Sequence, residues 1–243
     1  MRILYLDCSI SGISGDMMLG ALHALGADME EIEKQLKQFP MEAFSLNISG
    51  VVKKGIYASK VDVVPEEEPY HHRHYSSIRK MIVESALSEK AKAFSLQIFE
   101  PIAAAEAAIH HTTVDEVHFH EVGAVDSIVD VVGAGIALDQ LEIEDVQASA
   151  VVLGNGKIKM AHGMYPIPAP ATMEMMKGIP VQEIDVRGEL TTPTGAGLIK
   201  GLASRYGTMP SMEVIEVGYG AGTKDFPDHP NVLRAVLGEK RKV

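Results

Sequence analysis

The chain gathers histidines and acidic residues in one short stretch between Glu106 and Ser127. Four of the ten histidines fall there, in a protein with a single cysteine. Neutral imidazole suits nickel, copper, zinc and iron, and carboxylates complete the coordination shell of such ions. The stretch therefore predicts a transition-metal site, whose candidate ligands are Glu106, His110, His118, His120 and Glu121.

The spacing of these residues places them in pairs. Glu106 and His110 are four residues apart, so on a helix they would lie one turn apart on one face. His118 and His120 would share one face of an extended segment, while Phe119 would pack inward. The alternative for each pair is an ordinary solvated face with a salt bridge or hydrogen bond.

Two aspartates follow on a predicted helix that begins near Val125. Asp126 and Asp130 are again four residues apart and lie beside the apolar stripe of that helix. A carboxylate there could hold a ligating histidine through its second ring nitrogen, as is common around bound metals.

Three further histidines lie in residues 65–75, which have neither helical nor strand periodicity. We expect this segment to be a flexible, solvent-facing loop that carries His71, His72 and His74. One interpretation is a capture arm that hands metal to a better-formed site. The other is a flexible loop that binds metals weakly and without purpose.

Two predicted helix starts could bind an anion, because the first turn of a helix has N–H groups without intrahelical partners. The first helix start, at Ser14-Gly15-Asp16, lacks the lysine of a P-loop, and Asp16 could equally be a helix cap. The second helix start, at Thr192-Pro193-Thr194-Gly195, offers two hydroxyls and a glycine, and is the better phosphate-binding site. The candidate phosphate-binding residues are Ser14, Gly15, Thr192, Thr194 and Gly195.

Hydrophobic periodicity outlines the elements that must position these groups. The predicted helices include residues 15–25, 28–36, 94–109 and 125–136, and Pro101 should kink or split the third of these. Shorter helices are predicted around Ile78–Ile82, before Gly178 and around Leu198–Leu202. The predicted strands are residues 3–8, a hairpin over 44–63 that turns near Gly55, a hairpin that turns at Gly154–Gly156, and residues 214–217 and 232–237.

Because the strands come in hairpins rather than in regular strand–helix–strand units, we predict an α+β fold. It would be a mixed sheet of hairpins packed with helices, with the His-rich loop on the surface. The predicted organisation is an N-terminal α/β segment over 1–64, the flexible loop over 65–75, and a helical and β-hairpin portion over 76–243 that forms one compact unit with 1–64.

Composition narrows the class of protein. A formal net charge of -11 over 243 residues disfavours non-specific binding to nucleic acid or to anionic membrane surfaces. No apolar run approaches the roughly 20 residues of a membrane span. Cys8 alone cannot form an internal disulfide, and Asp7 comes too early for a signal peptide, so a cytoplasmic protein is expected. Neither a Gly-x-Ser-x-Gly elbow nor a Cys-x-x-Cys motif is present.

Several of these segments, taken together, resemble the LarC family of nickel insertion proteins. The resemblance runs nearly end to end, and its most specific block begins at His118. The matching segments are Tyr5-Leu6-Asp7-Cys8, Gly12-Ile13-Ser14-Gly15-Asp16-Met17, Ala105-Glu106 with His110, His118-Phe119-His120-Glu121-Val122-Gly123-Ala124-Val125-Asp126-Ser127, Pro168-Ala169-Pro170-Ala171-Thr172, Leu190-Thr191-Thr192-Pro193-Thr194-Gly195-Ala196, Gly218-Tyr219-Gly220-Ala221-Gly222 and Pro230-Asn231-Val232-Leu233-Arg234.

The resemblance implies a chelatase-type lyase that completes the nickel-pincer cofactor of lactate racemase. Its substrate would be a pyridinium mononucleotide with two thiocarboxylates, and nickel would bind both sulfurs and a ring carbon. Forming the nickel–carbon bond displaces a ring proton, so a base is needed. The candidate catalytic residues are Asp16, Asp126 and Glu121.

In the family the reaction depends on CTP, with magnesium or manganese, and longer members carry a C-terminal region that binds this nucleotide. Here the chain ends soon after Leu237, so we expect a separately made partner region or a longer product. A homo-oligomer is also compatible with the sequence. The rival functions are a nickel storage or metallochaperone module without catalysis, and a metal-dependent hydrolase that uses metal-bound water.

Overall fold

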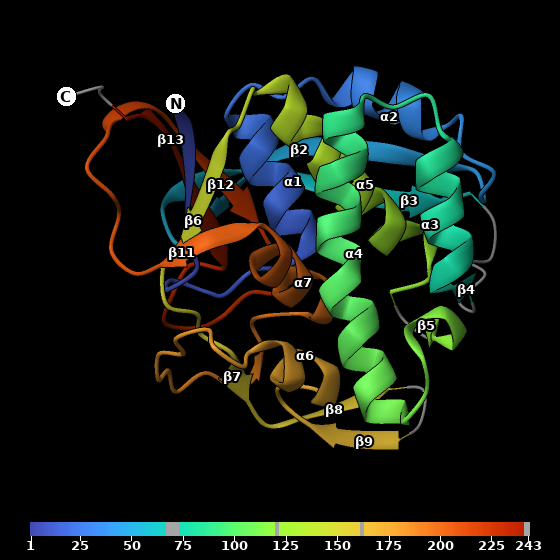
Figure 1. Ribbon diagram of the computed structural model, residues 1–243. Coiled ribbons are helices and arrows are strands. Elements are labelled where there is room, and N and C mark those ends of the chain that lie inside the picture. The colour runs from blue at the N-terminus through green and yellow to red at the C-terminus, as the bar shows by residue number, and fades with distance from the viewer. Residues whose placement is uncertain (67–72, 120–121, 161–162, 241–243) are drawn as a thin grey trace.

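A computed structural model describes residues 1–66, 73–119, 122–160 and 163–240 (Figure 1). Within these residues the helices are α1 (Gly15–Ala24), α2 (Met29–Leu36), α3 (Tyr75–Glu84), α4 (Glu89–His110), α5 (Val125–Gln140), α6 (Pro170–Met175) and α7 (Pro193–Leu202), with one 3-10 turn over Val114–Glu116.

The largest sheet of the described chain has seven strands, in the order β11-β6-β1-β13-β12-β3-β2. Its strands are β1 (Arg2–Asp7), β2 (Phe44–Lys53), β3 (Ile56–Pro65), β6 (Asp145–Ala148), β11 (Ala203–Tyr206), β12 (Glu213–Ala221) and β13 (Val232–Glu239). Three small antiparallel pairs accompany it: β4 (Arg73–His74) with β5 (His118–Phe119), β7 (Gly154–Asn155) with β10 (Gly188–Glu189), and β8 (Lys157–Met160) with β9 (Gly163–Pro166).

The strand directions decide where the loops meet. β1 pairs in parallel with β6, β6 with β11, and β12 with β3, whereas β13 is antiparallel to both β1 and β12. β1, β3, β6, β11 and β12 therefore run in one direction, and their carboxyl ends lie along one edge of the sheet. Loops that follow these strands converge at that edge, where open sheets commonly bind ligands.

The helices stack in layers on the sheet (Figure 1). α1 lies against β3 and β12, α5 packs on α1, and α4 packs across α5 and α7. Glycine permits the closest of these contacts, because a Cβ on Gly220 of β12 would lie 1.8 Å from the carbonyl oxygen of Met17 in α1. The apolar residues of α5 are buried between these layers and form the centre of the main hydrophobic core.

The structure confirms the predicted fold class, a mixed sheet with hairpins packed against helices. The β2–β3 hairpin turns at Lys54 and Gly55, both with positive φ, as the sequence predicts. Residues 67–72, which hold most of the predicted His-rich loop, lie outside the described residues. Among the described residues, none of the helices combines the length and hydrophobicity needed to span a bilayer.

The predicted hairpin at Gly154–Gly156 is wrong. β6 pairs in parallel with β1 and β11, and β8 pairs with β9 rather than with β6. Val146 and Ala148 are buried in the sheet, so tertiary burial outweighs the local turn signal.

Pro101 was predicted to kink or split a helix, and the split is wrong, because α4 runs through Pro101 as one element of 22 residues. Proline cannot donate a hydrogen bond to the carbonyl of Gln97, one turn earlier. Gly201 of α7 lies against this carbonyl, and a Cβ there would come within 2.0 Å of its oxygen. Close packing of a neighbouring helix therefore covers the interrupted turn.

Candidate functional site

A pocket of about 350 Å³ opens at the carboxyl edge of the sheet. This volume is at the lower end of the range for small-molecule sites. The described residues that line it include no lysine or arginine. They are Ser14, Gly15, Asp16, Asp62, Val63, Val122, Asp126, Ser127, Asp130, Glu189, Thr192, Pro193, Thr194 and Thr223.

Three helices begin at this pocket. Gly15 starts α1, Val125 starts α5 and Pro193 starts α7, and residues of all three first turns line the cavity. The hydroxyl of Thr192 caps α7 by accepting a hydrogen bond from the Gly195 amide at 3.1 Å. The Ser14 side chain makes no such cap on α1. Converging N-termini place partial positive charge on the pocket and favour an anionic ligand group.

Glycines let these helix starts approach one another. A Cβ on Gly195 would lie 1.9 Å from the carbonyl oxygen of Ile13, just before α1. The Thr192 amide donates to the same oxygen at 3.1 Å. A Cβ on Gly15 would lie 2.1 Å from Oδ2 of Asp130 on α5. Both glycines were candidate phosphate ligands, and the structure shows that each also holds two elements in contact.

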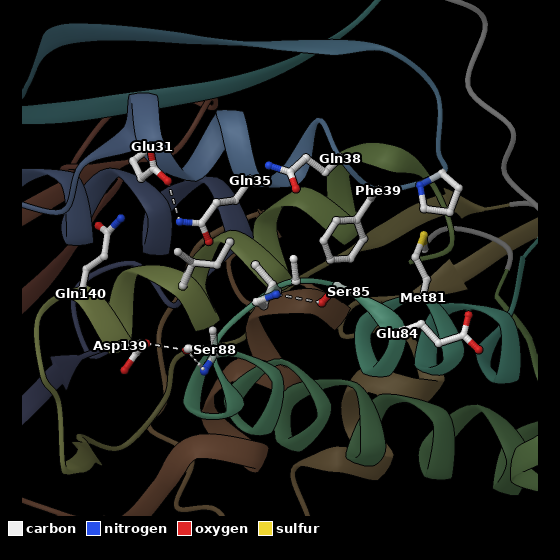
Figure 2. A pocket seen from close by; sticks show the side chains of 15 residues that line it. Glu31, Gln35, Gln38, Phe39, Met81, Glu84, Ser85, Ser88, Asp139 and Gln140 are labelled. Carbon is white, nitrogen blue, oxygen red and sulfur yellow. Dashed lines mark hydrogen bonds between the residues drawn. The ribbon is translucent and has the colours of Figure 1, made fainter.

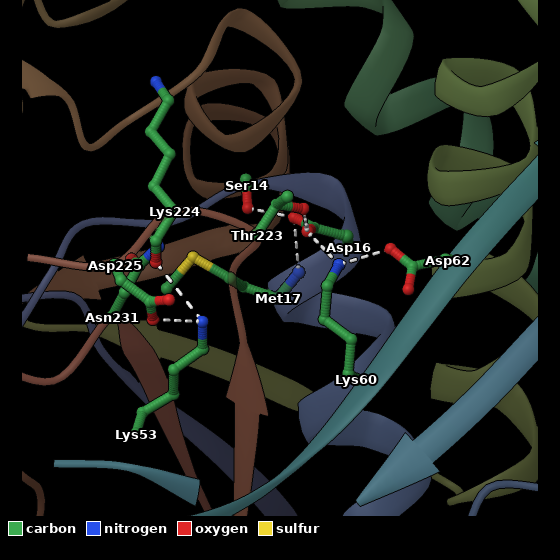
Figure 3. A network of polar contacts seen from close by, with 10 residues as sticks. All are labelled: Ser14, Asp16, Met17, Lys53, Lys60, Asp62, Thr223, Lys224, Asp225 and Asn231. Carbon is green, nitrogen blue, oxygen red and sulfur yellow. Dashed lines mark hydrogen bonds and ion pairs between the residues drawn. The ribbon is translucent and has the colours of Figure 1, made fainter. Parts of the chain in front are cut away.

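A buried lysine organises the acidic groups on one side of the pocket (Figure 3). Lys60 Nζ lies 2.8 Å from Asp16 Oδ2 and 2.6 Å from Asp62 Oδ1. Burial acts to lower the pKa of Lys60, but the two carboxylates outweigh it, so the net shift is upward. Asp16 also accepts hydrogen bonds from the Ser14 hydroxyl and, at 3.4 Å, from Thr223.

Asp130, one helical turn after Asp126, has a different environment. Its Oδ1 is buried and has no hydrogen-bond partner among the described residues. Burial raises the pKa of its carboxyl well above the ordinary value, and the charges of Asp16 and Asp126 raise it further, against the opposing effect of Lys60. A carboxyl in such a site holds a proton more tightly than a solvated carboxyl does.

Two predicted metal ligands face each other on the short β4–β5 pair. His74 and His118 occupy opposite positions, with ring centroids 3.5 Å apart, and both are exposed. Phe119 points the other way and is buried against Tyr75 and Phe99. The alternation of exposed and buried side chains in the sequence is therefore present in the structure.

This histidine pair is close to the pocket along the chain. Val122, four residues after His118, already lines the cavity, so their Cα atoms are at most about 14 Å apart. Arg73, next to His74, pairs with Glu42 and donates a hydrogen bond to the carbonyl of Gly123 at 2.7 Å. Arg73 thereby ties the histidine pair to the segment that leads into α5.

The other predicted ligand pair lies at the end of α4. His110 Nε2 is 3.4 Å from Glu106 Oε2, as the helical spacing predicts. In the described ranges, no group of three or more His, Cys, Asp or Glu side chains is arranged to hold a metal ion. His71, His72, His120 and Glu121 lie outside those ranges.

The described candidate residues thus lie in three places, namely the pocket, the β4–β5 pair and the end of α4. Ser14, Gly15, Asp16, Asp126, Thr192 and Thr194 line one pocket, and Gly195 packs beside it. Sequence reasoning did not single out Lys60, Asp62 or Thr223. A lysine within the valine-rich β3 strand was the available signal, since a buried charge needs a partner.

A second pocket, of about 710 Å³, lies at the other end of α5 (Figure 2). Its walls include Phe39, Met81 and Gln140, and none of the candidate site residues lines it. The larger volume is therefore not where the predicted chemistry gathers.

The chain matches known proteins along nearly its whole length. Residues 4–243 match the family described as "Nickel insertion protein". The chain is 52% identical over its whole length to the pyridinium-3,5-bisthiocarboxylic acid mononucleotide nickel insertion protein of Geobacillus kaustophilus, and covers 61% of that protein. It is 53% identical over 98% of its length to the protein of the same name in Staphylococcus epidermidis, of which it covers 60%.

A "Putative nickel insertion protein" of Geotalea uraniireducens is 46% identical over the whole chain, which covers 62% of it. The chain thus spans about three fifths of the length of these relatives. No solved structure shows a significant match to it.

Proposed function

The chain belongs to the nickel insertion protein family, and we propose that it takes part in placing nickel into a pyridinium-3,5-bisthiocarboxylic acid mononucleotide, the compound in its relatives' names. The observation that carries this proposal is the pocket at the carboxyl edge of the sheet. There, three helix N-termini meet a set of carboxylates, namely Asp16, Asp62, Asp126, Asp130 and Glu189.

These two kinds of group suit the two ends of such a substrate. The phosphate of a mononucleotide is an anion, and the helix starts at Ser14 and Thr192 offer amides and hydroxyls to it. The pyridinium ring and the nickel ion are cations, and the carboxylates favour both. We propose that the phosphate binds at Ser14, Gly15, Thr192, Thr194 and Gly195, with the ring toward α5 and β3.

Nickel is a substrate of the proposed reaction, and we propose that histidine side chains bind it before the mononucleotide does. The facing rings of His74 and His118 are borderline ligands, and the pair Glu106–His110 is a second place for an ion. Soft thiocarboxylate sulfurs can take nickel from such ligands. His71, His72, His120 and Glu121 belong to the same hypothesis as further ligands.

Bond formation between nickel and the ring carbon replaces a C–H bond. The proton must leave to a base, and this lyase-type step needs no change of oxidation state. Among the predicted bases, Asp16 is held by Lys60 and by two hydroxyls, and Asp126 is exposed. The requirement for CTP with magnesium or manganese remains part of the proposal and concerns the full-length family.

Product formation tests this function directly. The chain is incubated with Ni²⁺ and the bisthiocarboxylate mononucleotide, with and without CTP and Mg²⁺, and the nickel-containing product is measured by mass spectrometry. Thr192→Ala/Thr194→Ala should weaken substrate binding at least tenfold. The matched control Gln38→Ala, in the pocket of Figure 2, should not. Nickel binding without any binding of the mononucleotide would point instead to a storage module.

A further inference from the structure

One pocket carboxyl differs from all the others in its partners. Asp130 lies on the inner side of α5, with Oδ1 inaccessible to solvent and without a hydrogen-bond partner in the part of the chain that the structure describes. Its other oxygen faces the Cα of Gly15, where even a methyl group would collide with it. A carboxyl left in this state costs folding free energy, so its presence calls for a functional reason.

The neighbouring charges explain why Asp130 stands apart. Among the described residues, the lysine that influences it is Lys60 on β3, which is already shared between Asp16 of α1 and Asp62 of β3. Asp126 on α5 is exposed and accepts a hydrogen bond from the Ser127 amide at 2.7 Å. Glu189 lines the same cavity. Asp130 therefore has other carboxylates around it, and the nearby Lys60 is already paired with two of them.

We propose that Asp130 accepts the proton that leaves the substrate ring when nickel binds the ring carbon. This assignment rests on the proposed function. In the step, the electron pair of the C–H bond becomes the nickel–carbon bond, and the proton passes to the Asp130 carboxylate, which becomes a neutral carboxyl. Ni²⁺ keeps its oxidation state, so this proton transfer itself needs no oxidant or reductant.

The environment of Asp130 suits both halves of that step. Burial and like charges raise its pKa, which makes its ionised form a stronger base than an ordinary solvated carboxylate. An incoming divalent cation favours that ionised form by opposite charge. Once the proton has arrived, the buried position stabilises the neutral carboxyl. Nickel entry and proton transfer are thereby coupled through one side chain.

The test compares Asp130→Asn with Asp139→Asn, the same change at the other end of α5. Single-turnover product formation is measured from pH 5 to pH 9, together with the dissociation constants for Ni²⁺ and for the mononucleotide. General-base catalysis contributes about 10²- to 10⁴-fold, so Asp130→Asn should slow the chemical step at least 100-fold. The dissociation constant for the mononucleotide should stay within about twofold, and Asp139→Asn should behave as wild type.

The possible negative results distinguish the role of Asp130 from the proposed function. Wild-type rates from Asp130→Asn would overturn the role of Asp130 and leave the proposed function intact. A wild-type protein that binds nickel and substrate but forms no product would overturn the proposed function, and this assignment with it. If Asp130→Asn does not fold, the wild-type profile decides: the rate should rise with pH above the ordinary carboxyl range, and a flat profile would overturn the proposal.

Discussion

Replacing Gly195 by alanine tests whether the helix starts must touch for the site to work. The new Cβ would lie 1.9 Å from the carbonyl oxygen and 2.5 Å from the carbonyl carbon of Ile13. Both are backbone atoms, so no side-chain rotation can relieve the overlap. Ordinary contact begins at 3.4 Å, so the α7 start and the loop before α1 must separate by about 1.5 Å.

The expected cost follows from that displacement. Overpacking of this kind costs about 1–3 kcal/mol, and the helix propensity of alanine returns at most about 1 kcal/mol. The hydrogen bond from the Thr192 amide to Ile13 would also break. We therefore expect a net loss of about 1–2 kcal/mol in the free energy of unfolding. Because the phosphate-binding site opens, affinity for the mononucleotide should fall at least tenfold.

Urea unfolding and isothermal titration with the mononucleotide measure the two effects. Gly133→Ala is the matched control, since it is also a helical glycine, and the nearest atom to its Cβ would be a flexible Leu19 methyl at 3.2 Å rather than backbone. That variant should unfold within about 1 kcal/mol of wild type and bind normally. If Gly195→Ala were as stable as wild type and bound the mononucleotide equally well, the contact would be irrelevant to the site.

Four further predictions concern three single side chains and one pair of histidines. Native Asp130 holds its proton to a higher pH than the unfolded chain does. Stability should therefore fall as pH rises above the ordinary carboxyl pKa, by at most about 1.4 kcal/mol per pH unit, until the folded pKa is passed. Urea titrations across pH should show this slope in wild type and not in Asp130→Asn. Lys60→Met should cost about 2 kcal/mol, because Asp16 and Asp62 lose their shared cation; an unchanged denaturation midpoint would contradict this. Phe119→Ala should cost about 3–5 kcal/mol by chemical denaturation, as the ring is fully buried. His74→Ala/His118→Ala should weaken nickel binding at least tenfold in equilibrium dialysis, and equal affinity would remove this pair from the ligand set.

Local patterns in the sequence were sufficient to predict several of the helices and strands. The β2–β3 hairpin, the start of α7 and the inward position of Phe119 each depend on residues that are neighbours in the chain. Periodicity and turn chemistry act over such short separations, so they can be read without the fold. The same reasoning was wrong at Gly154, where contacts with distant strands outweigh the turn signal.

The site, by contrast, depends on strand order and direction. Asp16 and Lys60 are 44 positions apart, and Gly15 and Asp130 are more than 100 apart, yet each pair is in contact. Only the placement of β3 beside β12, under α1, brings the lysine to Asp16 and leaves Asp130 without a cation of its own. The sequence by itself determined which groups could do the chemistry. The tertiary structure decided which of them share a pocket, because charge compensation and burial depend on distances through space and not along the chain.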